Sequence, residues 1–344
     1  MIKRSVDLNL EIVAELAQGF EGKAEQARLL INASASAGAD AAKFQLVYAD
    51  ELATPDYQYY ELFQSLEMDD ATWEKLASYA RELRIKLYVD IFGEKSLQLA
   101  EKIGVETIKL HGTDIANIGL LNKVAHSSIP KVMLGAGGAY RTELMKAIDI
   151  LSAKGKEIVV LLGFQGYPTP TDMNQIARVK LLSEEIVERF TNVTVGFADH
   201  ADPESPLAYA LSATAIGAGA RVIEKHLTLA KSMKLEDHEA ALNPDEFTTF
   251  CETMRSCLRA FGESNVQEDF GMSESELGYR TMIRRHVVAS KNLAVGTELS
   301  SSDLVLKRTS EENSIHSLEL AYGKRIQRQL NENAPVLEND LMGY

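Results

Sequence analysis

Residues 11–46 read EIVAELAQGFEGKAEQARLLINASASAGADAAKFQL and contain the pattern that decides the fold. An apolar segment at 11–17 precedes an amphipathic stretch at 24–38 that ends in glycine, and a second apolar segment follows at 41–46. Strands that are apolar on both faces are typical of parallel sheets covered by helices. A glycine at the end of a helix takes the left-handed conformation that turns the chain. The pattern therefore predicts a strand–helix–strand unit.

The same unit repeats along most of the chain. Eight strand–helix units within roughly 260 residues predict a closed (β/α)8 barrel, a TIM barrel of the α/β class. The alternative is a doubly wound open sheet, but no glycine-rich phosphate-binding sequence follows the first strand, where a nucleotide-binding fold of that kind carries one. The apolar segments lie at 11–17, 41–46, 86–92, 107–112, 131–137, 158–164, 193–199 and 221–227.

The sequence changes character after Gly262. Residues 263–283 are acidic, contain Gly and Ser and have weak periodicity, which predicts a linker. Residues 284–344 contain short β segments separated by Gly, Asn and Pro turns, which predict a small, mostly-β domain. The barrel is thus expected to occupy residues 1–262. A domain of about 60 residues buries little core by itself, so we expect it to pack against something else.

Composition and charge limit the possible functions. Lys and Arg number 36 against 50 Asp and Glu, which gives a formal net charge of −14. We therefore expect no nucleic-acid partner and no membrane partner, because both require a basic face. Cys251 and Cys257 do not share a helix face, so a disulfide between them is not expected. The N-terminus lacks a signal-peptide core, and the longest apolar run, at 158–164, is too short to span a bilayer. A cytoplasmic location is expected.

Polar and ionisable residues stand at the ends of the predicted strands, where a barrel of this type places its reactive groups. Burying such groups costs free energy unless they are paired or used. We therefore predict a functional site at this end of the barrel. In chain order, these residues are Glu15, Lys43, Gln45, Asp90, Lys109, His111, Asp114, Gln165, Tyr167, Asp199, His200, Glu224 and His226.

Two histidines suggest a metal site. His200 and His226 end neighbouring strands, and the carboxylates Asp199 and Glu224 stand close to them in the sequence. Imidazole and carboxylate groups that converge in this way bind divalent metals. The alternative is that each is a hydrogen-bonded core histidine. The presence of two on adjacent strand ends favours the metal.

Two lysines suggest an anion site. Lys43 and Lys109 end strands two and four, and they would either hold a phosphate or carboxylate or form salt bridges with Glu15 or Asp90. The spacing alone leaves both possibilities open. Tyr167 begins the proline-rich sequence YPTP, which would hold its ring at the rim or merely anchor a loop.

Longer stretches resemble a known family. The resemblance is to the sialic acid (N-acetylneuraminate) synthases, a family that also includes legionaminate and pseudaminate synthases and spore-coat polysaccharide enzymes. It covers nearly the whole chain, and the C-terminal domain is similar to the antifreeze-like (SAF) domain. The stretches that carry it are KFQ (43–45), YPTP (167–170), DH (199–200), VIEKHLTL (222–229), EDHEAALNPDEF (236–247) and VASKNLAVGTELSSSDLVLKR (288–308).

The resemblance implies an activity. The chain is expected to be a transferase that condenses phosphoenolpyruvate with an N-acyl-mannosamine-type amino sugar, giving a nonulosonic (sialic-acid-like) acid and phosphate for polysaccharide synthesis. It implies a divalent metal, Mn2+ or Mg2+, and a homodimer with a swapped C-terminal domain. The matching positions are His200 and His226 for the metal, Lys43 and Lys109 for phosphoenolpyruvate, Glu15 and Asp114 for catalysis (the latter handling the attacking water), Gln45 and Gln165 for the pocket, Tyr167 and Asp237 for the sugar, and Arg308 for the N-acyl group in the partner's barrel.

The chain also departs from the family pattern. Asp90 replaces a Thr that contacts phosphoenolpyruvate, and Gly112 and Gly135 replace serines, so three hydroxyl groups are absent together. A divergent member is therefore expected. Two alternatives remain: an aldolase or lyase of the same barrel that uses another enol donor, and a non-catalytic degenerate synthase that binds sugar.

Overall fold

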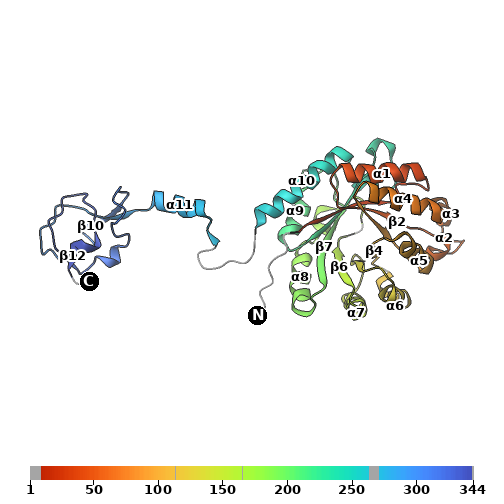
Figure 1. The fold of residues 1–344 in the computed structure, drawn as a ribbon, viewed down its shortest axis with the longest axis horizontal. Coiled ribbons are helices and arrows are strands. Elements are labelled where there is room, and N and C mark those ends of the chain that lie inside the picture. Colours follow the sequence, from red (N-terminus) through yellow and green to blue (C-terminus); the bar gives the residue numbers. More distant parts are fainter. Residues whose placement is uncertain (1–8, 113, 165, 263–270, 343–344) are drawn as a thin grey trace. The chain divides into compact units, whose positions relative to one another are not determined.

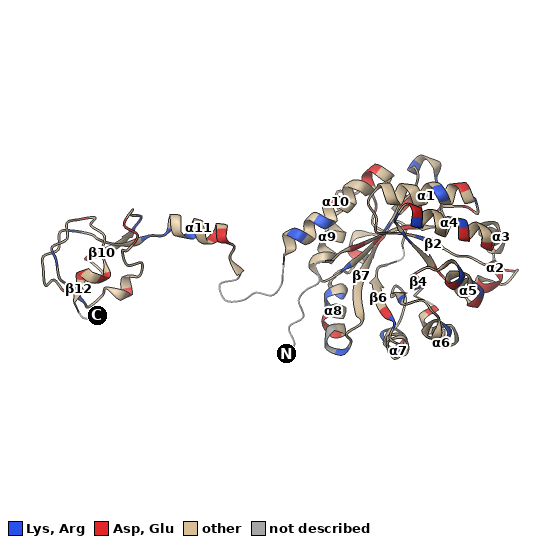
Figure 2. Ribbon diagram, in the orientation of Figure 1, with Lys and Arg blue, Asp and Glu red and all other residues tan. Residues whose placement is uncertain are grey.

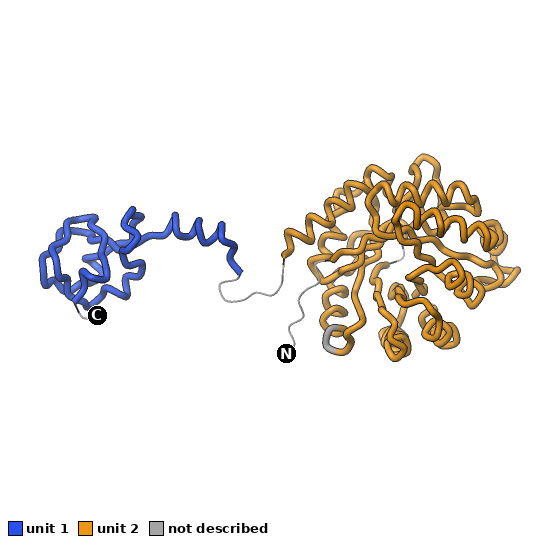
Figure 3. The backbone as a smooth tube through the Cα atoms, in the orientation of Figure 1, with its two compact units in different colours: residues 1, 264–344 blue, residues 2–263 orange. Residues whose placement is uncertain are grey.

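A computed structural model describes residues 9–112, 114–164, 166–262 and 271–342 of the 344-residue chain. The chain divides into two compact units, residues 2–263 and residues 264–344 (Figure 3).

The first unit is a closed barrel of eight parallel strands, which pair in chain order until β8 returns to β1 (Figure 1). The predicted TIM barrel is therefore confirmed, and the open-sheet alternative is wrong. Each predicted strand is present to within two residues at either end. The strands are β1 (Glu11–Ala17), β2 (Ala41–Gln45), β3 (Lys86–Asp90), β4 (Thr107–Leu110), β5 (Lys131–Gly135), β6 (Glu157–Leu162), β7 (Val193–Asp199) and β8 (Val222–His226).

Helices surround the barrel and cover its strands (Figure 1). Both basic and acidic residues lie on the outer helices (Figure 2). Glycines with a left-handed backbone follow these helices, as predicted for the stretch at 24–38: Gly38 has a φ of 81°, and Gly104, at the end of α5, has a φ of 72°. The helices are α1 (Ala24–Ser36), α2 (Ala49–Leu52), α3 (Tyr60–Leu66), α4 (Asp70–Glu82), α5 (Glu94–Ile103), α6 (Ile118–His126), α7 (Arg141–Ser152), α8 (Ala177–Arg189), α9 (Ala210–Gly217) and α10 (Pro244–Phe261), with short 3-10 turns η1 (Asp114–Ala116), η2 (Thr171–Met173), η3 (Lys231–Met233) and η4 (His238–Ala240).

Alternate residues of each strand point into the barrel, and the others pack against the helices. Some of the outward-facing side chains are aromatic. Phe44 of β2 packs edge-to-face against Trp73 of α4, with ring centroids 5.9 Å apart. Such a contact contributes about 0.5–1.5 kcal/mol beyond burial, and it holds the strand position next to Lys43. The inward face forms a smaller apolar cluster of Val13, Ala41, Tyr88, Met133, Val159, Leu161 and Val222.

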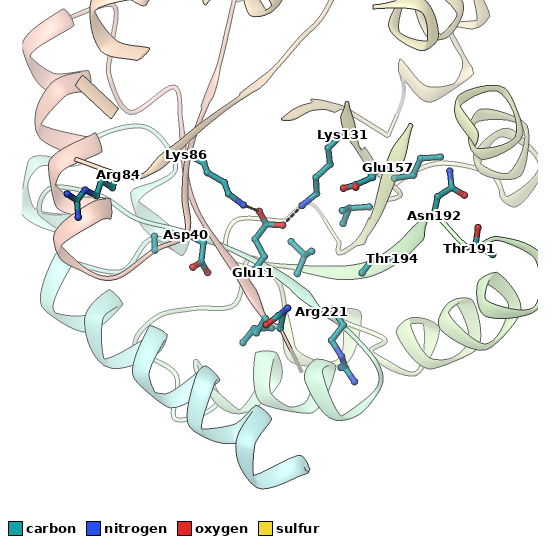
Figure 4. Close-up of a pocket in the computed structure, with 16 residues that line it drawn as sticks. Glu11, Asp40, Arg84, Lys86, Lys131, Glu157, Thr191, Asn192, Thr194 and Arg221 are labelled. Atoms are coloured by element: carbon teal, nitrogen blue, oxygen red, sulfur yellow. Dashed lines mark hydrogen bonds and ion pairs between the residues drawn. The ribbon is translucent and has the colours of Figure 1, made fainter. Parts of the chain in front are cut away.

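A polar cavity of about 860 Å³ opens at the amino end of the barrel (Figure 4). Glu11 lies at its wall between Lys86 and Lys131, and it also accepts a hydrogen bond from the hydroxyl of Tyr88. Burial alone raises the pKa of Glu11, but Lys131, then Tyr88 and Lys86, reverse this effect and hold the pKa below its ordinary value. The carboxylate thus ties β1 to β3 and β5, and the reactive groups of such barrels lie at the other end. We interpret this network as structural.

The second unit contains helix α11 (Glu274–Ile283) and a small β domain. The sequence predicted a linker over 263–283, and residues 263–270 of it lie outside the described part of the chain. Residues 274–283 form a helix within the predicted linker. Ser273 and Glu276 form a capping box at its start, in which the Ser273 amide donates to Glu276 Oε2 at 2.7 Å. No side chain of α11, which is described in full, is buried, and this explains the weak apolar periodicity.

The β domain has its own apolar core. Strand β9 (His286–Ala289) pairs antiparallel with β10 (Leu304–Lys307), and β11 (Arg325–Ile326) pairs antiparallel with β12 (Leu341–Met342). The turns η6 (Leu318–Leu320) and η7 (Glu338–Asp340) lie before β11 and before β12, respectively. The core residues are Val287, Ala289, Leu293, Leu299, Leu304, Ile315, Ala321, Ile326, Leu330, Val336 and Leu341.

Two further features bear on the sequence expectations. Cys251 and Cys257 of α10 carry free thiols. Among the helices that the structure describes, none is both long and apolar enough to cross a membrane.

We expect Glu11→Gln to lower the free energy of unfolding at pH 7 by about 1 kcal/mol, because it removes a half-buried carboxylate from between two ammonium groups that are partly exposed. A carboxyl group with a depressed folded pKa stabilises the protein above its unfolded pKa, and this stabilisation is lost as the pH falls through the folded value. Urea denaturation should therefore show a difference from the wild type that is largest near pH 7 and shrinks below about pH 4.5. Glu157→Gln, at an exposed residue of the same cavity, is the control, and equal losses at both positions would contradict the structural role of Glu11.

Candidate active site

Five charged side chains form one buried layer inside the carboxyl end of the barrel. They come from β1, β2, β3, β4 and β8. Each lies two residues after another inward-facing residue of the same strand. The register pairs Glu15 with Lys43 and Asp90 with Lys109, so the alternation that builds the core also aligns the charges. The layer consists of Glu15, Lys43, Asp90, Lys109 and Glu224, each at most 5% exposed.

Opposite charges alternate within this charged layer. The Lys43 Nζ atom lies 2.6 Å from Asp90 Oδ1 and 3.6 Å from Glu224 Oε2, and it also forms an ion pair with Glu15. The Lys109 Nζ atom lies 2.5 Å from Glu224 Oε1 and 3.8 Å from Glu15 Oε2. Removing one partner from such an arrangement leaves a buried charge uncompensated. Of the two possibilities that the spacing left open, the structure shows both lysines in salt bridges; their role in binding phosphoenolpyruvate stays a prediction.

The layer holds three carboxyl groups against two ammonium groups, and Glu15 absorbs the imbalance. Burial raises the pKa of Glu15 to about 8, with Lys43 opposing this shift and Glu224 and Asp90 adding to it. Burial also acts on Asp90 and Glu224, but Lys43 and Lys109 outweigh it and lower the pKa of both carboxyls. Of the three carboxyl groups, Glu15 is thus the one that gains a proton most readily, which would balance the remaining charges of the layer.

The structure brings the two predicted histidines together. His200 follows β7 and His226 ends β8, and their ring centroids lie 5.4 Å apart. His200 Nδ1 lies 3.0 Å from the carbonyl oxygen of Phe164; donation to this carbonyl places the proton on Nδ1 and leaves a lone pair on Nε2. Burial lowers the pKa of His200 to about 4 and that of His226 well below its ordinary value. Both rings are thus neutral at pH 7, the state in which imidazole binds metals.

Asp199 does not join this pair, contrary to the expectation from the sequence. Its Oδ1 atom lies 3.2 Å from the Lys225 ammonium, and its Oδ2 atom accepts a hydrogen bond from Ser212 of α9 at 2.5 Å. Because side chains alternate along a strand, Asp199 and Lys225 point toward the helices, whereas Glu224 and His226 point inward. Glu224, the other carboxylate that the sequence placed near the histidines, is therefore the one that shares the inward face with His226 and acts electrostatically on His200.

One of the two predicted sugar contacts, Tyr167, packs against the histidines, and the other, Asp237, interacts electrostatically with Tyr167. The ring of Tyr167, which precedes a cis peptide bond to Pro168, packs edge-on against His200 and His226 with centroids 4.9 and 5.5 Å away. Burial, followed by the charge of Asp237, raises the pKa of Tyr167, so its hydroxyl stays protonated. Burial also raises the pKa of Asp237 to about 6, and the neighbouring acids Glu236 and Glu239 add to the effect.

The other predicted residues are less tightly grouped. Gln45 is half-buried and accepts a hydrogen bond from Gln18 at 2.7 Å. Asp114 begins η1, and burial raises its pKa. Gln165 lies outside the described residues. Arg308 belongs to the second unit, directly after β10, where its exposed side chain donates through Nε to the carbonyl of Ile283 at 3.2 Å.

The structure shows why one of the three hydroxyl groups missing from the family pattern, the one at position 112, has no room. A Cβ atom at Gly112 would lie 1.9 Å from the carbonyl oxygen of Gly137, so no serine fits there unless the loop after β5 moves. Near it, Asp90 Oδ2 lies 2.8 Å from Nε2 of His111. The loops after β4 and β5 are thus in direct backbone contact.

The histidine pair fits a metal ion only in part. Within the described ranges, no group of three or more His, Cys, Asp and Glu side chains forms a cation site. Yet Glu224 Oε2, which is buried beside the rings, accepts no hydrogen bond from the described residues. The two neutral imidazoles are donors of the type that divalent metals take, but Glu224 does not complete a set of three with them. The remaining donors would have to come from substrate or water.

A closed barrel with buried charges and paired neutral imidazoles at the carboxyl ends of its strands defines a barrel enzyme site. Comparison with known proteins then identifies the family: the NeuB family model matches residues 30–266, and the SAF domain model matches residues 284–342. The chain belongs to the NeuB family and is an enzyme, and its second unit is a SAF domain. The resemblance noted in the sequence is confirmed.

Curated relatives span nearly the whole chain. An N,N'-diacetyllegionaminic acid synthase of Legionella pneumophila is 26% identical over 97% of this chain and 95% of its own. An N-acetylneuraminate-9-phosphate synthase of Drosophila melanogaster is 25% identical over 96% of this chain and 95% of its own. A solved N-acetylneuraminic acid (sialic acid) synthetase from Leptospira borgpetersenii aligns with a TM-score of 0.71 at 24% identity, covering 79% of this chain and 91% of that one, and this likeness supports the fold.

We expect Asp237→Asn to stabilise the protein by about 2 kcal/mol at pH 8 and much less at pH 4.5. A carboxyl with a raised folded pKa binds its proton more tightly in the folded state, so its cost is absent below the unfolded pKa and complete above the folded value of about 6. Thermal denaturation at the two pH values measures this difference. Asparagine also tolerates the φ of 60° at this position, which adds a gain independent of pH. An equal gain at both pH values would therefore argue against the raised pKa.

Proposed function

We propose that this chain condenses phosphoenolpyruvate with an N-acyl-mannosamine-type amino sugar to give a nonulosonic acid and phosphate. The observation that carries the proposal is the pair of neutral imidazoles, His200 and His226, beside a layer that contains two buried lysines. The relatives named above are synthases of legionaminic and N-acetylneuraminic acids, and they support the same substrate class.

We propose that His200 and His226 hold a divalent cation, Mn2+ or Mg2+. When bound there, it would polarise the aldehyde carbonyl of the open-chain sugar. His200 is already oriented for this role by the Phe164 carbonyl, and both rings are uncharged. Tyr167 packs across both rings and limits the access of water from its side.

The charged layer binds the anionic substrate by exchange. Lys43 and Lys109 would release carboxylate partners and turn to the phosphate and carboxylate of phosphoenolpyruvate. Protonation of Glu15 would lower the free-energy cost of this exchange. A neutral Glu15 attracts the Lys43 ammonium less strongly, and it does not become an uncompensated anion when Lys43 turns to the substrate. Gln45 and Gln165 would complete the pocket, and Asp114 would orient the attacking water.

The sugar would be held by Tyr167 and Asp237 of one subunit and by Arg308 of another. A homodimer with swapped C-terminal domains is proposed because that domain is small and presents Arg308 on its surface. A cytoplasmic location, with no nucleic-acid and no membrane partner, is part of the same proposal.

A second function has two observations in its favour. Asp90 occupies the side of Lys43 that an anion would need, and Gly112 offers no hydroxyl. These two features would interfere less with substrate binding in an aldolase or lyase that uses another enol donor. A non-catalytic degenerate synthase that binds sugar is the third possibility.

The wild-type enzyme should release phosphate from phosphoenolpyruvate in the presence of N-acetylmannosamine or a related amino sugar, and only with Mn2+ or Mg2+. His200→Ala and His226→Ala should each reduce this rate by at least about 100-fold and abolish Mn2+ binding measured by calorimetry, because each removes a donor. His126→Ala, at an exposed histidine of α6, should change neither.

The alternatives predict other results. Metal-dependent turnover of the sugar without phosphate release would favour the aldolase or lyase. Sugar binding that survives in both histidine variants, with no turnover by the wild type, would favour the non-catalytic protein.

Mixing two inactive variants tests the swapped dimer. Arg308→Ala keeps an intact barrel, and His226→Ala keeps an intact C-terminal domain. If Arg308 acts in the partner's barrel, each mixed dimer has one complete site, so an equal mixture, refolded together, should regain roughly one quarter of wild-type activity. Lys307→Ala, which removes the neighbouring cation, should remain active by itself. No recovery in the mixture would show that Arg308 does not act across subunits.

A further inference from the structure

Asp90 and His111 form a buried carboxylate–imidazole pair at the mouth of the charged layer. Asp90 ends β3, His111 follows β4, and these neighbouring strands pair Asp90 with Lys109. Asp90 Oδ2 lies 2.8 Å from His111 Nε2, while its Oδ1 atom lies 2.6 Å from the Lys43 ammonium. The carboxylate is fully buried and fixed on both oxygens, so it holds the imidazole in one orientation.

The His111 side chain is partly exposed on the side away from the charged layer's buried carboxylate. The Asp90 carboxylate, which can only accept, accepts a hydrogen bond from Nε2–H, and this leaves Nδ1 as the nitrogen that can give or accept a proton. The His111 side chain is 24% exposed, and its ring lies against Phe92 with centroids 5.3 Å apart. A fixed orienting group on one nitrogen and access on the other is the arrangement of a general acid–base histidine.

His111 is also close to the residues that would surround the sugar. It interacts electrostatically with Asp114 of η1 and with Asp237 before η4. The other charges that reach the pair are Lys43 on β2 and Lys109 on β4, both through Asp90. The imidazole therefore interacts both with the charged layer and with two of the predicted site acids outside it.

We propose that His111 is a catalytic acid–base residue of this enzyme and that Asp90 is its positioning residue. The inference rests on the proposed condensation. It gives a function to Asp90, which stands at the end of β3 where the family pattern has a threonine. It also gives His111 a part in handling the attacking water, which would otherwise fall to Asp114 alone.

The proton transfers balance with a single imidazole. The enol double bond supplies the electron pair of the new carbon–carbon bond to the aldehyde carbon, and the aldehyde oxygen takes the proton from imidazolium Nδ1. Water then adds to the former enol carbon and returns a proton to Nδ1. The bond from that carbon to the phosphate oxygen breaks, and the proton of the new hydroxyl leaves with phosphate as the keto group forms. The two oxygens served by Nδ1 sit on carbons separated by one atom, within reach of one ring.

The test compares His111→Gln and His111→Ala with the wild type under the Mn2+-dependent phosphate-release assay. Glutamine keeps a donor for Asp90 but cannot carry the proton, so kcat should fall by about 10²–10⁴-fold while KM for phosphoenolpyruvate and Mn2+ binding change little. The pH profile of kcat should lose the limb that His111 contributes. Added imidazole should restore part of the rate of His111→Ala, which a purely structural role would not allow. Asp90→Asn should lower kcat and displace the profile, with Mn2+ binding retained.

The outcomes separate the two proposals. If the wild type releases phosphate while His111→Gln keeps its rate and pH profile, or if His111→Ala is not rescued by imidazole, the role of His111 is wrong and the condensation stands. If the wild type releases no phosphate with any amino sugar, the condensation itself is wrong and this step with it.

Discussion

The buried ammonium group of Lys43 is the constraint on which the site depends. It lies among the carboxyl groups of Glu15, Asp90 and Glu224, and each of these connects it to something else. Glu224 continues to Lys109, Asp90 holds His111, and Glu15 takes up a proton in response to its surroundings. Without Lys43, the three acids would face Lys109 alone, and each uncompensated buried charge costs several kcal/mol. The stability of the barrel interior and the ion pairs of the candidate site thus depend on one network.

Much of this was predictable because barrels impose a simple rule. Eight apolar segments gave the strands, and the parallel topology placed their carboxyl ends together. His200 and His226 could therefore be paired from sequence, although they are far apart in the chain. Where the prediction was wrong, at Asp199, the alternation of side chains had been ignored: this residue faces the helices and pairs with Lys225.

Other features had no local signal. The carbonyl of Phe164 orients His200, but a backbone group leaves no trace in the residue type. The pairing of Asp90 with His111 depends on the distance between two strand ends, which spacing does not give. Helix α11 has no buried face, so the periodicity that identifies helices was missing there. In each case tertiary contact, or its absence, decided the outcome.

The close approach of Gly112 to the carbonyl of Gly137 has a consequence for redesign of the site. A single substitution cannot place a serine at position 112, because its Cβ atom would lie 1.9 Å from that carbonyl oxygen. A hydroxyl group at this corner would require a second change that moves the loop after β5. Engineering of this part of the site therefore has to treat the two loops as one unit.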